Sequence, residues 1–344
     1  ILHWQVVGDH GKVIADGTRR VDAAPHATVE VTLGAVRLPS DVREAYLNLS
    51  WTPVDAAPFI NTDYEVAYDQ FVLSGKVEMN IDPATGALRS YIYNRKELLF
   101  SPVTLSLYRP VTDNDNREKV GGAKAWKKAG LDQLTQRALT VKTSTRGGRA
   151  EVELLNVRGE KVGTASFVYT LKKNGELDIQ THFVPDTTVI SSLARVGFTF
   201  EMPDTYSQVS YLGRGDHETY MDRNQSGKIG IYHTDVERMF HYYVRPQATG
   251  NRTDVRWMQL ADEAGEGLAF RSDTSFQFSV VPFTDENLDA ATHINQLRRE
   301  GVITVHLDAA QAGVGTATCG PGVLPQYRVP VQDYTFRFTI RPLK

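Results

Sequence analysis

The chain has little of three things that would point directly to a function. It holds one cysteine in 344 residues, which excludes an internal disulfide and a multi-cysteine metal cluster and leaves the redox compartment open. Its 38 Lys and Arg residues against 41 Asp and Glu give a net charge of −3, with no basic block of the kind that binds nucleic acid. No run approaches the ~18 apolar residues that a membrane-spanning helix needs. We therefore expect no nucleic-acid partner and no membrane span.

The composition predicts a folded chain, because 41% hydrophobic and 23% charged residues lie outside the signature of disorder. The length allows two or three domains, or one large β domain with an appendage. The sequence opens with ILHWQVV, with no initiator methionine and no turn residue. We expect the chain to be a piece of a longer polypeptide.

Alternation of apolar and polar residues predicts that most of the chain is β-strand. Ala27–Leu33 (ATVEVTL) and Asp333–Leu343 (DYTFRFTIRPL) each alternate in this way, as strands with one buried face do. Gly163–Pro185 reads as two strands joined across an Asn-Gly pair, the strongest short signal of a hairpin. Asp82–Gly86 (DPATG) predicts a turn between two further strands.

Helix and domain signals are fewer. A helical pattern occurs only at Glu286–Glu300, after a Thr-Asp start. Its expected buried face is made of Leu288, Ala291, Ile294 and Leu297. The proline-bearing stretch Pro53–Asp69 breaks the strand pattern, so we place a domain boundary near residue 70. Residues 1–70 are too few for an immunoglobulin-like sandwich of ~100 residues, which indicates that its first strands are missing.

Sequence motifs for metal, phosphate and nucleophilic chemistry are absent. His217-Glu218 begins like a zinc helix, but Met221 stands where the second histidine belongs. Asp113-Asn114-Asp115 has the first spacing of a calcium loop, yet Arg117 occupies the next ligand position. The chain has no nucleophile elbow and no glycine loop between a strand and a helix that would bind phosphate.

The remaining polar candidates favour structural roles. Glycoside hydrolysis needs two facing carboxylates, and the sequence cannot pair its candidates, for which turn caps and salt bridges are the favoured interpretation. These candidates are Asp216, Glu218, Asp222 and Asp254. Four histidines are likewise interpreted as structural: His182, His217, His233 and His241. A nucleophilic cysteine needs a general base, and the sequence spacing nominates none for Cys319. We therefore interpret Cys319 as a small, partly buried loop residue.

Six ordered segments carry a family resemblance. Tyr211–Arg223 (YLGRGDHETYMDR) resembles the GxGPxExYxDR motif in the C-terminal domain of family 2 β-galactosidases, although Arg214-Gly215-Asp216 departs where the family often has proline. The other five are RPVTDND (109–115), WKKAG (126–130), RPQATGNRTDVRW (245–257), FQFSVVPF (276–283) and QAGVGTATCGPG (311–322). The opening segment ILHWQVVGDHGKVIADG is similar to the immunoglobulin-like domain that precedes this domain in the family.

The resemblance implies an all-β fold in two domains. Residues 1–70 would be a partial immunoglobulin-like sandwich, and residues 71–344 a large antiparallel super-sandwich similar to galactose mutarotase. It also implies that the parent is a retaining β-galactosidase that hydrolyses terminal β-D-galactosides such as lactose, with two glutamates on a central barrel. That barrel lies outside this chain, so the resemblance implies an inactive fragment and no catalytic residue within it.

Cofactors and partners follow from the same resemblance. Magnesium and sodium are expected at barrel sites of the parent, and no cofactor is expected in this chain. The expected partners are the barrel and other domains of the parent, the galactoside substrate and further copies of the parent in an oligomer. The compartment stays open between cytoplasm and periplasm.

The family's terminal domain brings two loops to the mouth of the barrel's active site. The first counterpart here is Asn116–Lys124, a shorter loop whose two glycines favour mobility and which holds Arg117 and Glu118. The second holds Thr318, Cys319 and Gly320, with Cys319 where some members carry a tryptophan that stacks on the aglycone, the non-galactose part of the substrate. Because a thiol offers no such face, we expect weaker aglycone stacking. The motif residues expected to be structural are Asp113, Asp115, Gly213, Glu218, Tyr220, Asp222, Arg223 and Trp257.

Two other functions remain open. The first is a stand-alone carbohydrate-binding module with its site on the concave face of the super-sandwich, which calorimetry with galactose or lactose would detect. The second is a mutarotase-like epimerase, which would need a His and Glu pair in the cleft. No histidine here aligns with such a pair, and polarimetry would detect the activity.

Overall fold

The chain forms two compact units in the computed structural model, which describes residues 1–8, 11–24, 26–34, 36, 38–39, 42, 45–73 and 77–343. The first unit holds Ile1–Val77 and two short turns, Tyr93–Lys96 and Lys173–Gly175. The second unit holds the rest of the chain. The secondary structure is mainly strand in both units, which confirms the predicted all-β fold class.

The first unit is built on a four-stranded antiparallel sheet with the order β2-β1-β3-β4. Its strands are β1 Leu2–Gly8, β2 Val13–Arg19, β3 Ala45–Trp51 and β4 Ala67–Leu73. Leu2, Val6 and Ala45 are its buried apolar residues, whereas β4 exposes nearly its whole length. The assignment of this unit as a partial immunoglobulin-like sandwich stays a prediction.

The strand predicted at Ala27–Leu33 is wrong. The segment is irregular and pairs with none of the described strands, and Val29 is 47% exposed. A strand needs a neighbour with a free edge as well as an alternating pattern. The free edges of this sheet belong to β2 and β4, and the segment pairs with neither, so its alternating pattern is not used in a sheet.

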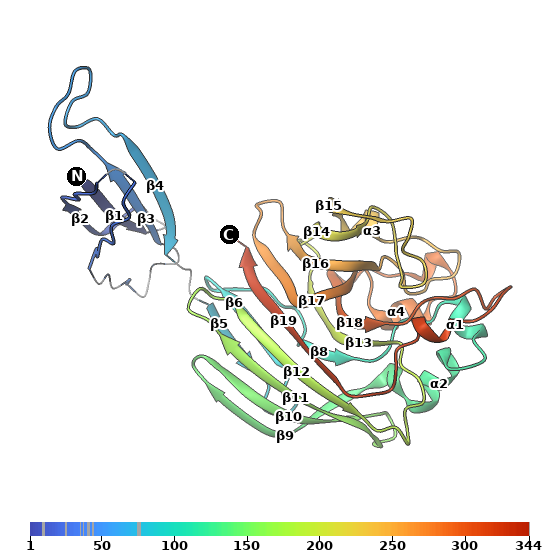
Figure 1. The fold of residues 1–344 in the computed structure, drawn as a ribbon. Coiled ribbons are helices and arrows are strands. Elements are labelled where there is room, and N and C mark those ends of the chain that lie inside the picture. Colours follow the sequence, from blue (N-terminus) through green and yellow to red (C-terminus); the bar gives the residue numbers. More distant parts are fainter. Residues whose placement is uncertain are drawn as a thin grey trace. The chain divides into compact units, whose positions relative to one another are not determined.

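The second unit is dominated by one antiparallel sheet of twelve strands (Figure 1). Nine strands follow the order β15-β14-β16-β17-β19-β12-β11-β10-β9, and a branch runs from β17 through β18 and β13 to β8. The bounds are β8 Thr104–Ser106, β9 Thr135–Ser144, β10 Gly147–Leu155, β11 Lys161–Leu171, β12 Leu177–Pro185, β13 Arg195–Pro203, β14 Gln208–Gly215, β15 Lys228–Asp235, β16 Arg252–Ala261, β17 Gly267–Val281, β18 Val302–Gln311 and β19 Tyr334–Leu343.

The long strand β17 divides this sheet into two layers. Its first half pairs with β19, whereas Gln277–Val281 pairs with β18. Aromatic rings pack between the resulting branches: Phe198 on β13 lies 5.4 Å from Phe336 and 5.8 Å from Phe338 on β19, measured between ring centroids. These apolar contacts form the core that holds the loops at the end of the unit.

Two predicted turns are confirmed. β11 and β12 form an antiparallel hairpin whose loop, Lys172–Glu176, contains Asn174-Gly175, with Gly175 at a φ of 83°. Asp82–Gly86 joins β5 Val77–Ile81 to β6 Leu88–Tyr93, and β7 Lys96–Glu97 completes a three-stranded sheet. The Asp82 carboxylate accepts hydrogen bonds from the amides of Ala84 and Thr85, which closes the turn. The predicted last strand is confirmed as β19.

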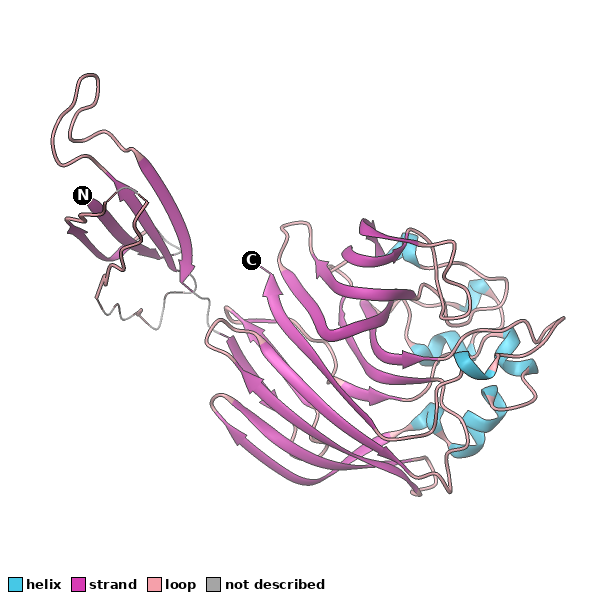
Figure 2. Ribbon diagram, viewed as in Figure 1, coloured by secondary structure: helices cyan, strands magenta, loops and turns pink. Residues whose placement is uncertain are grey.

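Helices are short and gather at one end of the second unit (Figure 2). They are α1 Asp113–Arg117, α2 Gly122–Ala129, α3 Val236–Met239 and α4 Asp285–Ala290, with the 3-10 turns η1 Leu131–Gln133, η2 Ile294–Gln296 and η3 Pro325–Tyr327. The sequence predicted one helix only and missed α1 to α3. Each of those three has eight residues or fewer, too short for a helical period to stand out.

The helix predicted at Glu286–Glu300 is wrong in extent. Thr284 caps α4 as expected, and Leu288 and Ala291 are buried. The helix ends at Ala290 because the Gln296 side chain accepts hydrogen bonds from the amides of Thr292 and His293, which turns the backbone away. Ile294 is consequently 40% exposed instead of buried.

Candidate functional site

Arg109 is the centre of the site that the family motifs build. Its guanidinium is fully buried and binds Asp115 through two nitrogens, at 2.7 and 3.1 Å. Its other N–H groups donate to the carbonyls of Ala312 at 2.7 Å and Gly313 at 2.9 Å and to the side-chain oxygen of Gln311 at 3.4 Å. Burial by itself lowers the pKa of Arg109, but the charge of Asp115 outweighs it and the pKa is raised. A permanently charged arginine therefore joins α1 to the start of the loop that holds Cys319.

Three further side chains hold the same loop, which runs from Ala312 to Val323 and which we call the Cys319 loop. Asn114 donates to the carbonyl of Gly315 at 2.9 Å and accepts from both the amide and the hydroxyl of Thr318, at 3.0 and 2.9 Å. Asp222 accepts from the amides of Val314 at 3.1 Å and Gly315 at 2.7 Å. Glu118 accepts from the amide of Val323 at 2.7 Å. The loop is thus anchored along most of its length.

Two glycines make these close contacts possible. A Cβ atom on Gly313 would lie 2.4 Å from Cγ of Asp222, and one on Gly322 would lie 2.2 Å from the carboxylate oxygens of Glu118. Neither distance is compatible with a side chain. The anchoring acids therefore account for Gly313 and Gly322, two of the four glycines of the loop.

The tip of the Cys319 loop is a tight turn that faces solvent. The amides of Cys319 and Gly320 both donate to the carbonyl of Thr316, at 3.0 and 2.7 Å. Cys319 is exposed, so its interpretation as a partly buried residue is wrong. The reason is local, since the anchors bind the two arms of the loop and leave the tip between them uncovered.

The first predicted loop, Asn116–Lys124, is mostly helix. Asn116 and Arg117 end α1, and Gly122 begins α2, so only residues 118–121 are a connection. Arg117 is exposed, while the Glu118 carboxylate turns inward to the Cys319 loop. The capping box of α1, in which Thr112 and Asp115 bond each other's backbone amides, was not recognised in the sequence.

Glu218, Tyr220 and Arg223 form a second cluster beside Arg109. The Glu218 carboxylate accepts from Tyr243, Thr249, the amide of Gly250 and Arg223. Tyr220 is buried with the guanidinium groups of Arg109 and Arg223 at 5.8 and 5.6 Å from its ring centroid. Burial raises the pKa of Tyr220 well above its usual value, so the phenol stays protonated.

The predicted motif residues do not all lie together. Asp115, Glu218, Tyr220, Asp222 and Arg223 belong to the network around Arg109 and the Cys319 loop. Asp113 is exposed and donates its amide to Gln247 at 2.9 Å, next to this network. Gly213 is a strand residue of β14 packed on Val255. Trp257 lies on β16, in a groove that none of the other predicted residues lines.

The candidate acids of hydrolysis all have structural partners. Asp254 pairs with Arg214, Asp216 bonds His217 at 3.0 Å, and Glu218 and Asp222 are engaged as described. The histidines are engaged too: His217 also bonds Ser226, His233 bonds Ser210, His182 lies 3.8 Å from Asp333 and His241 meets the ring of Tyr243 edge-on. These contacts fit the turn-cap and salt-bridge roles favoured from the sequence.

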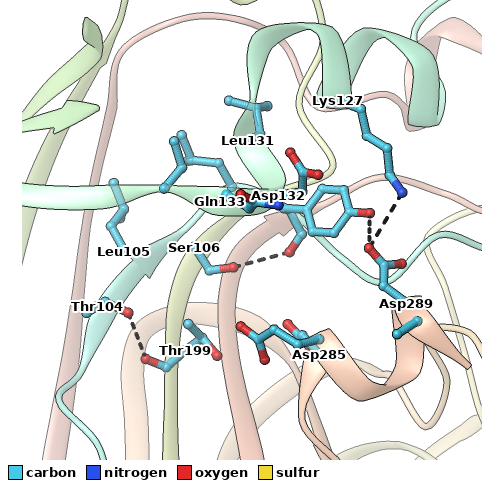
Figure 3. Close-up of a pocket in the computed structure, with 15 residues that line it drawn as sticks. Thr104, Leu105, Ser106, Lys127, Leu131, Asp132, Gln133, Thr199, Asp285 and Asp289 are labelled. Atoms are coloured by element: carbon cyan, nitrogen blue, oxygen red, sulfur yellow. Dashed lines mark hydrogen bonds and ion pairs between the residues drawn. The ribbon is translucent and has the colours of Figure 1, made fainter. Parts of the chain in front are cut away.

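The lining of a cavity of about 470 Å³ includes none of the predicted site residues. Figure 3 shows the residues that line it. Asp285 and Asp289 line it, but both are engaged. Asp289 accepts from the Tyr108 hydroxyl and the amide of Val111, with Lys127 at 3.8 Å, and Asp285 bonds His306 at 3.1 Å. In the described part of the chain no group of three or more metal-binding side chains occurs.

Sequence reasoning missed the two residues that organise the site. Arg109 and Asn114 lie in the segment RPVTDND, which carried the resemblance, but neither was selected. Their partners on the Cys319 loop lie 201 to 204 residues away in the chain. The sequence feature that could have identified Arg109 and Asn114 was their presence in the same short motif as Asp113 and Asp115.

Comparison with known proteins identifies the family of this chain. The model of the β-galactosidase small chain matches residues 74–340, and that of β-galactosidase domain 4 matches residues 1–74. The chain belongs to the β-galactosidase small-chain family. Relatives include β-galactosidase from Priestia megaterium, 28% identical over 98% of this chain and 35% of that protein, and β-galactosidase 2 from Enterobacter cloacae, 27% identical over 99% and 36%.

The chain spans about a third of the length of these β-galactosidase relatives. It corresponds to their C-terminal portion, as the sequence motifs indicated. Among solved structures, galactose 1-epimerase from Lactobacillus acidophilus aligns with a TM-score of 0.36 and 8% identity, covering 87% of this chain and 94% of that one. No helix in the described ranges combines the length and the apolar character that a membrane span requires.

Proposed function

We propose that this chain is the non-catalytic C-terminal part of a retaining family 2 β-galactosidase that hydrolyses terminal β-D-galactosides such as lactose. In this proposal the parent's two catalytic glutamates, with its magnesium and sodium ions, lie on a barrel outside the chain. The chain contributes the rim of the aglycone side of the active site and contacts to other domains and subunits. Membership of the small-chain family supports the assignment.

One observation supports the proposal that the Cys319 loop belongs to the rim of the parent's active site. The Cys319 loop ends in an exposed turn, yet both of its arms are fixed by buried or half-buried charged and amide side chains. A loop that served only as a connection would need no such anchoring. An exposed tip held in one geometry is suited to contact a ligand bound by another part of the parent.

The inactivity of the isolated chain is supported by the partners of its acids. Each of Asp216, Glu218, Asp222 and Asp254 is bound to a cation, a histidine or backbone amides. A glycosidase needs two acids that face the scissile bond instead. The sequence upstream in the parent tests the proposal directly, because two barrel glutamates should be found there; without them the parent would be a carbohydrate-binding relative.

We predict that Cys319→Trp in the full-length enzyme tightens binding of galactosides with glucose or aromatic aglycones. An indole at the exposed tip offers a large apolar face, and a stacked ring contributes about 0.5 to 1.5 kcal/mol. The inhibition constants of matched aromatic and methyl galactosides measure the effect, since only those with a ring as aglycone should bind more tightly.

The control for this substitution is Val157→Trp, which places the same residue at an exposed turn outside the Cys319 loop. It should leave all inhibition constants unchanged. The nucleophile interpretation of Cys319 would return if a small alkylating agent abolished hydrolysis of methyl galactoside, where no aglycone ring is present to be hindered.

A further inference from the structure

A groove on the outer face of the sheet gathers side chains that have no role in the network around Arg109. Trp257 and Gln259 lie two residues apart on β16, so both point away from the core, into which Met258 and Leu260 are buried. The neighbouring strands add Arg271 and Arg341. We call this the Trp257 groove; its lining is Glu176, Trp257, Gln259, Ala269, Phe270, Arg271, Thr339 and Arg341.

The strand register explains how the groove forms. Trp257 pairs with Arg271 and then Thr339 across β16, β17 and β19, and Gln259 pairs with Ala269 and then Arg341. Directly opposed residues on neighbouring strands lie about 5 Å apart, so these two rows form one continuous surface. Ala269 is the smallest residue in it. A methyl group between an indole, an amide and two guanidinium groups leaves a hollow of about 410 Å³.

Several side chains of this surface have no interaction partner within the described part of the chain. There, the side chains of Trp257, Gln259 and Arg341 have no hydrogen bond, ion pair or ring contact, although their backbones pair in the sheet. Arg271 differs, because it lies 3.2 Å from the carboxylate of Glu176, which Lys172 also contacts at 3.4 Å. The groove therefore offers an open indole face, an amide and one unpaired guanidinium.

We propose that the Trp257 groove binds a saccharide. A sugar ring presents an apolar face of C–H groups that stacks on an indole, and hydroxyl groups at its edge that bond planar amide, guanidinium and carboxylate groups. The hollow falls within the range of about 300 to 1,000 Å³ of small-molecule sites. A simple anion is disfavoured, since the two guanidinium groups and one carboxylate leave a single positive charge in an open groove.

The groove is separate from the rim proposed above, because it shares no residue with the Cys319 loop. The proposal adds a second contact with carbohydrate to this chain and does not rest on the parent's catalytic activity. Failure of the Cys319→Trp prediction would leave saccharide binding by the 344-residue chain unaffected, so the two proposals can fail independently.

The test is a titration of the 344-residue chain with galactose, lactose and maltose, followed by NMR of the indole N–H signals. The chain has four tryptophans, and Trp257→Phe identifies the signal of Trp257. We expect that signal alone to shift and to saturate at millimolar saccharide. Trp257→Ala should weaken the affinity measured by calorimetry by about tenfold, with smaller losses for Gln259→Ala and Arg341→Ala.

Phe100→Ala is the matched control, since it removes an aromatic ring that is 63% exposed and lies outside the groove, and it should leave the affinity unchanged. Thermal melting establishes whether each variant is folded. If Trp257→Ala does not fold, the affinities of Gln259→Ala and Arg341→Ala for saccharide test the proposal. The proposal is overturned if the folded chain shows no saturable shift of the Trp257 signal, if folded groove variants bind saccharide as well as the wild type, or if only inorganic phosphate moves the signal.

Discussion

Replacing Arg109 with alanine should destabilise the chain by about 3 to 5 kcal/mol, because it leaves the buried carboxylate of Asp115 without its cation. The substitution also removes the donors to the carbonyls of Ala312 and Gly313. Both losses fall on the Cys319 loop and α1. Urea denaturation, followed by tryptophan fluorescence, measures the free energy of unfolding.

Arg137→Ala is the control for this substitution. Arg137 also pairs with a carboxylate, that of Glu153, but its side chain is 64% exposed, and exposed pairs contribute at most about 1 kcal/mol. If the two variants lost equal stability, burial would not be what makes Arg109 important. The double variant Arg109→Met with Asp115→Leu should recover much of the loss, since no unpaired charge remains.

Replacing Asp222 with alanine in the full-length enzyme should raise the KM for galactosides with large aglycones by about tenfold and change kcat much less. The two amides that it holds, of Val314 and Gly315, lose a charged acceptor, and each such bond contributes about 1.5 to 3 kcal/mol. The arm of the Cys319 loop then moves, and the tip with it. Steady-state kinetics on galactosides with a series of aglycones measures the changes in KM and kcat separately.

Two further variants separate positioning from general damage. Asp222→Asn keeps one acceptor oxygen and should restore part of the KM. Asp273→Ala removes an exposed carboxylate whose partner is Arg337 and should leave the kinetics unchanged. A uniform loss of kcat for all substrates in Asp222→Ala, including methyl galactoside, would argue against a rim that acts on the aglycone alone.

Local patterns succeeded where a structure depends on neighbours in the sequence. The Asn-Gly hairpin and the alternating last strand were predicted because turn chemistry and strand periodicity are properties of a few consecutive residues. The same reasoning failed at Ala27–Leu33, where the alternation was present but the segment pairs with none of the described strands. It failed again at Glu286–Glu300, where the Gln296 side chain ended the helix early.

The candidate site likewise divides into residues that a local sequence motif predicts and residues that only distant contacts reveal. The motif residues Asp115, Tyr220 and Asp222 were predicted, because short sequence motifs of a family survive in order even when overall identity is near 28%. Arg109 and Asn114 were overlooked, since nothing local marks a side chain whose partners lie some two hundred positions further on. The place of Glu118 at the substrate rim stays a prediction, and its carboxylate accepts from the backbone of the Cys319 loop.

The sequence by itself determined that this chain is mainly β and that its motifs are those of the C-terminal part of a β-galactosidase. Only the tertiary structure decided how the motifs meet: Arg109, Asn114, Glu118 and Asp222 fix the two arms of one loop and leave the tip at Cys319 exposed. It also decided that Trp257 borders an open groove. The physical reason is that periodicity is read along the chain, whereas hydrogen bonds and register across strands join residues that the chain keeps far apart.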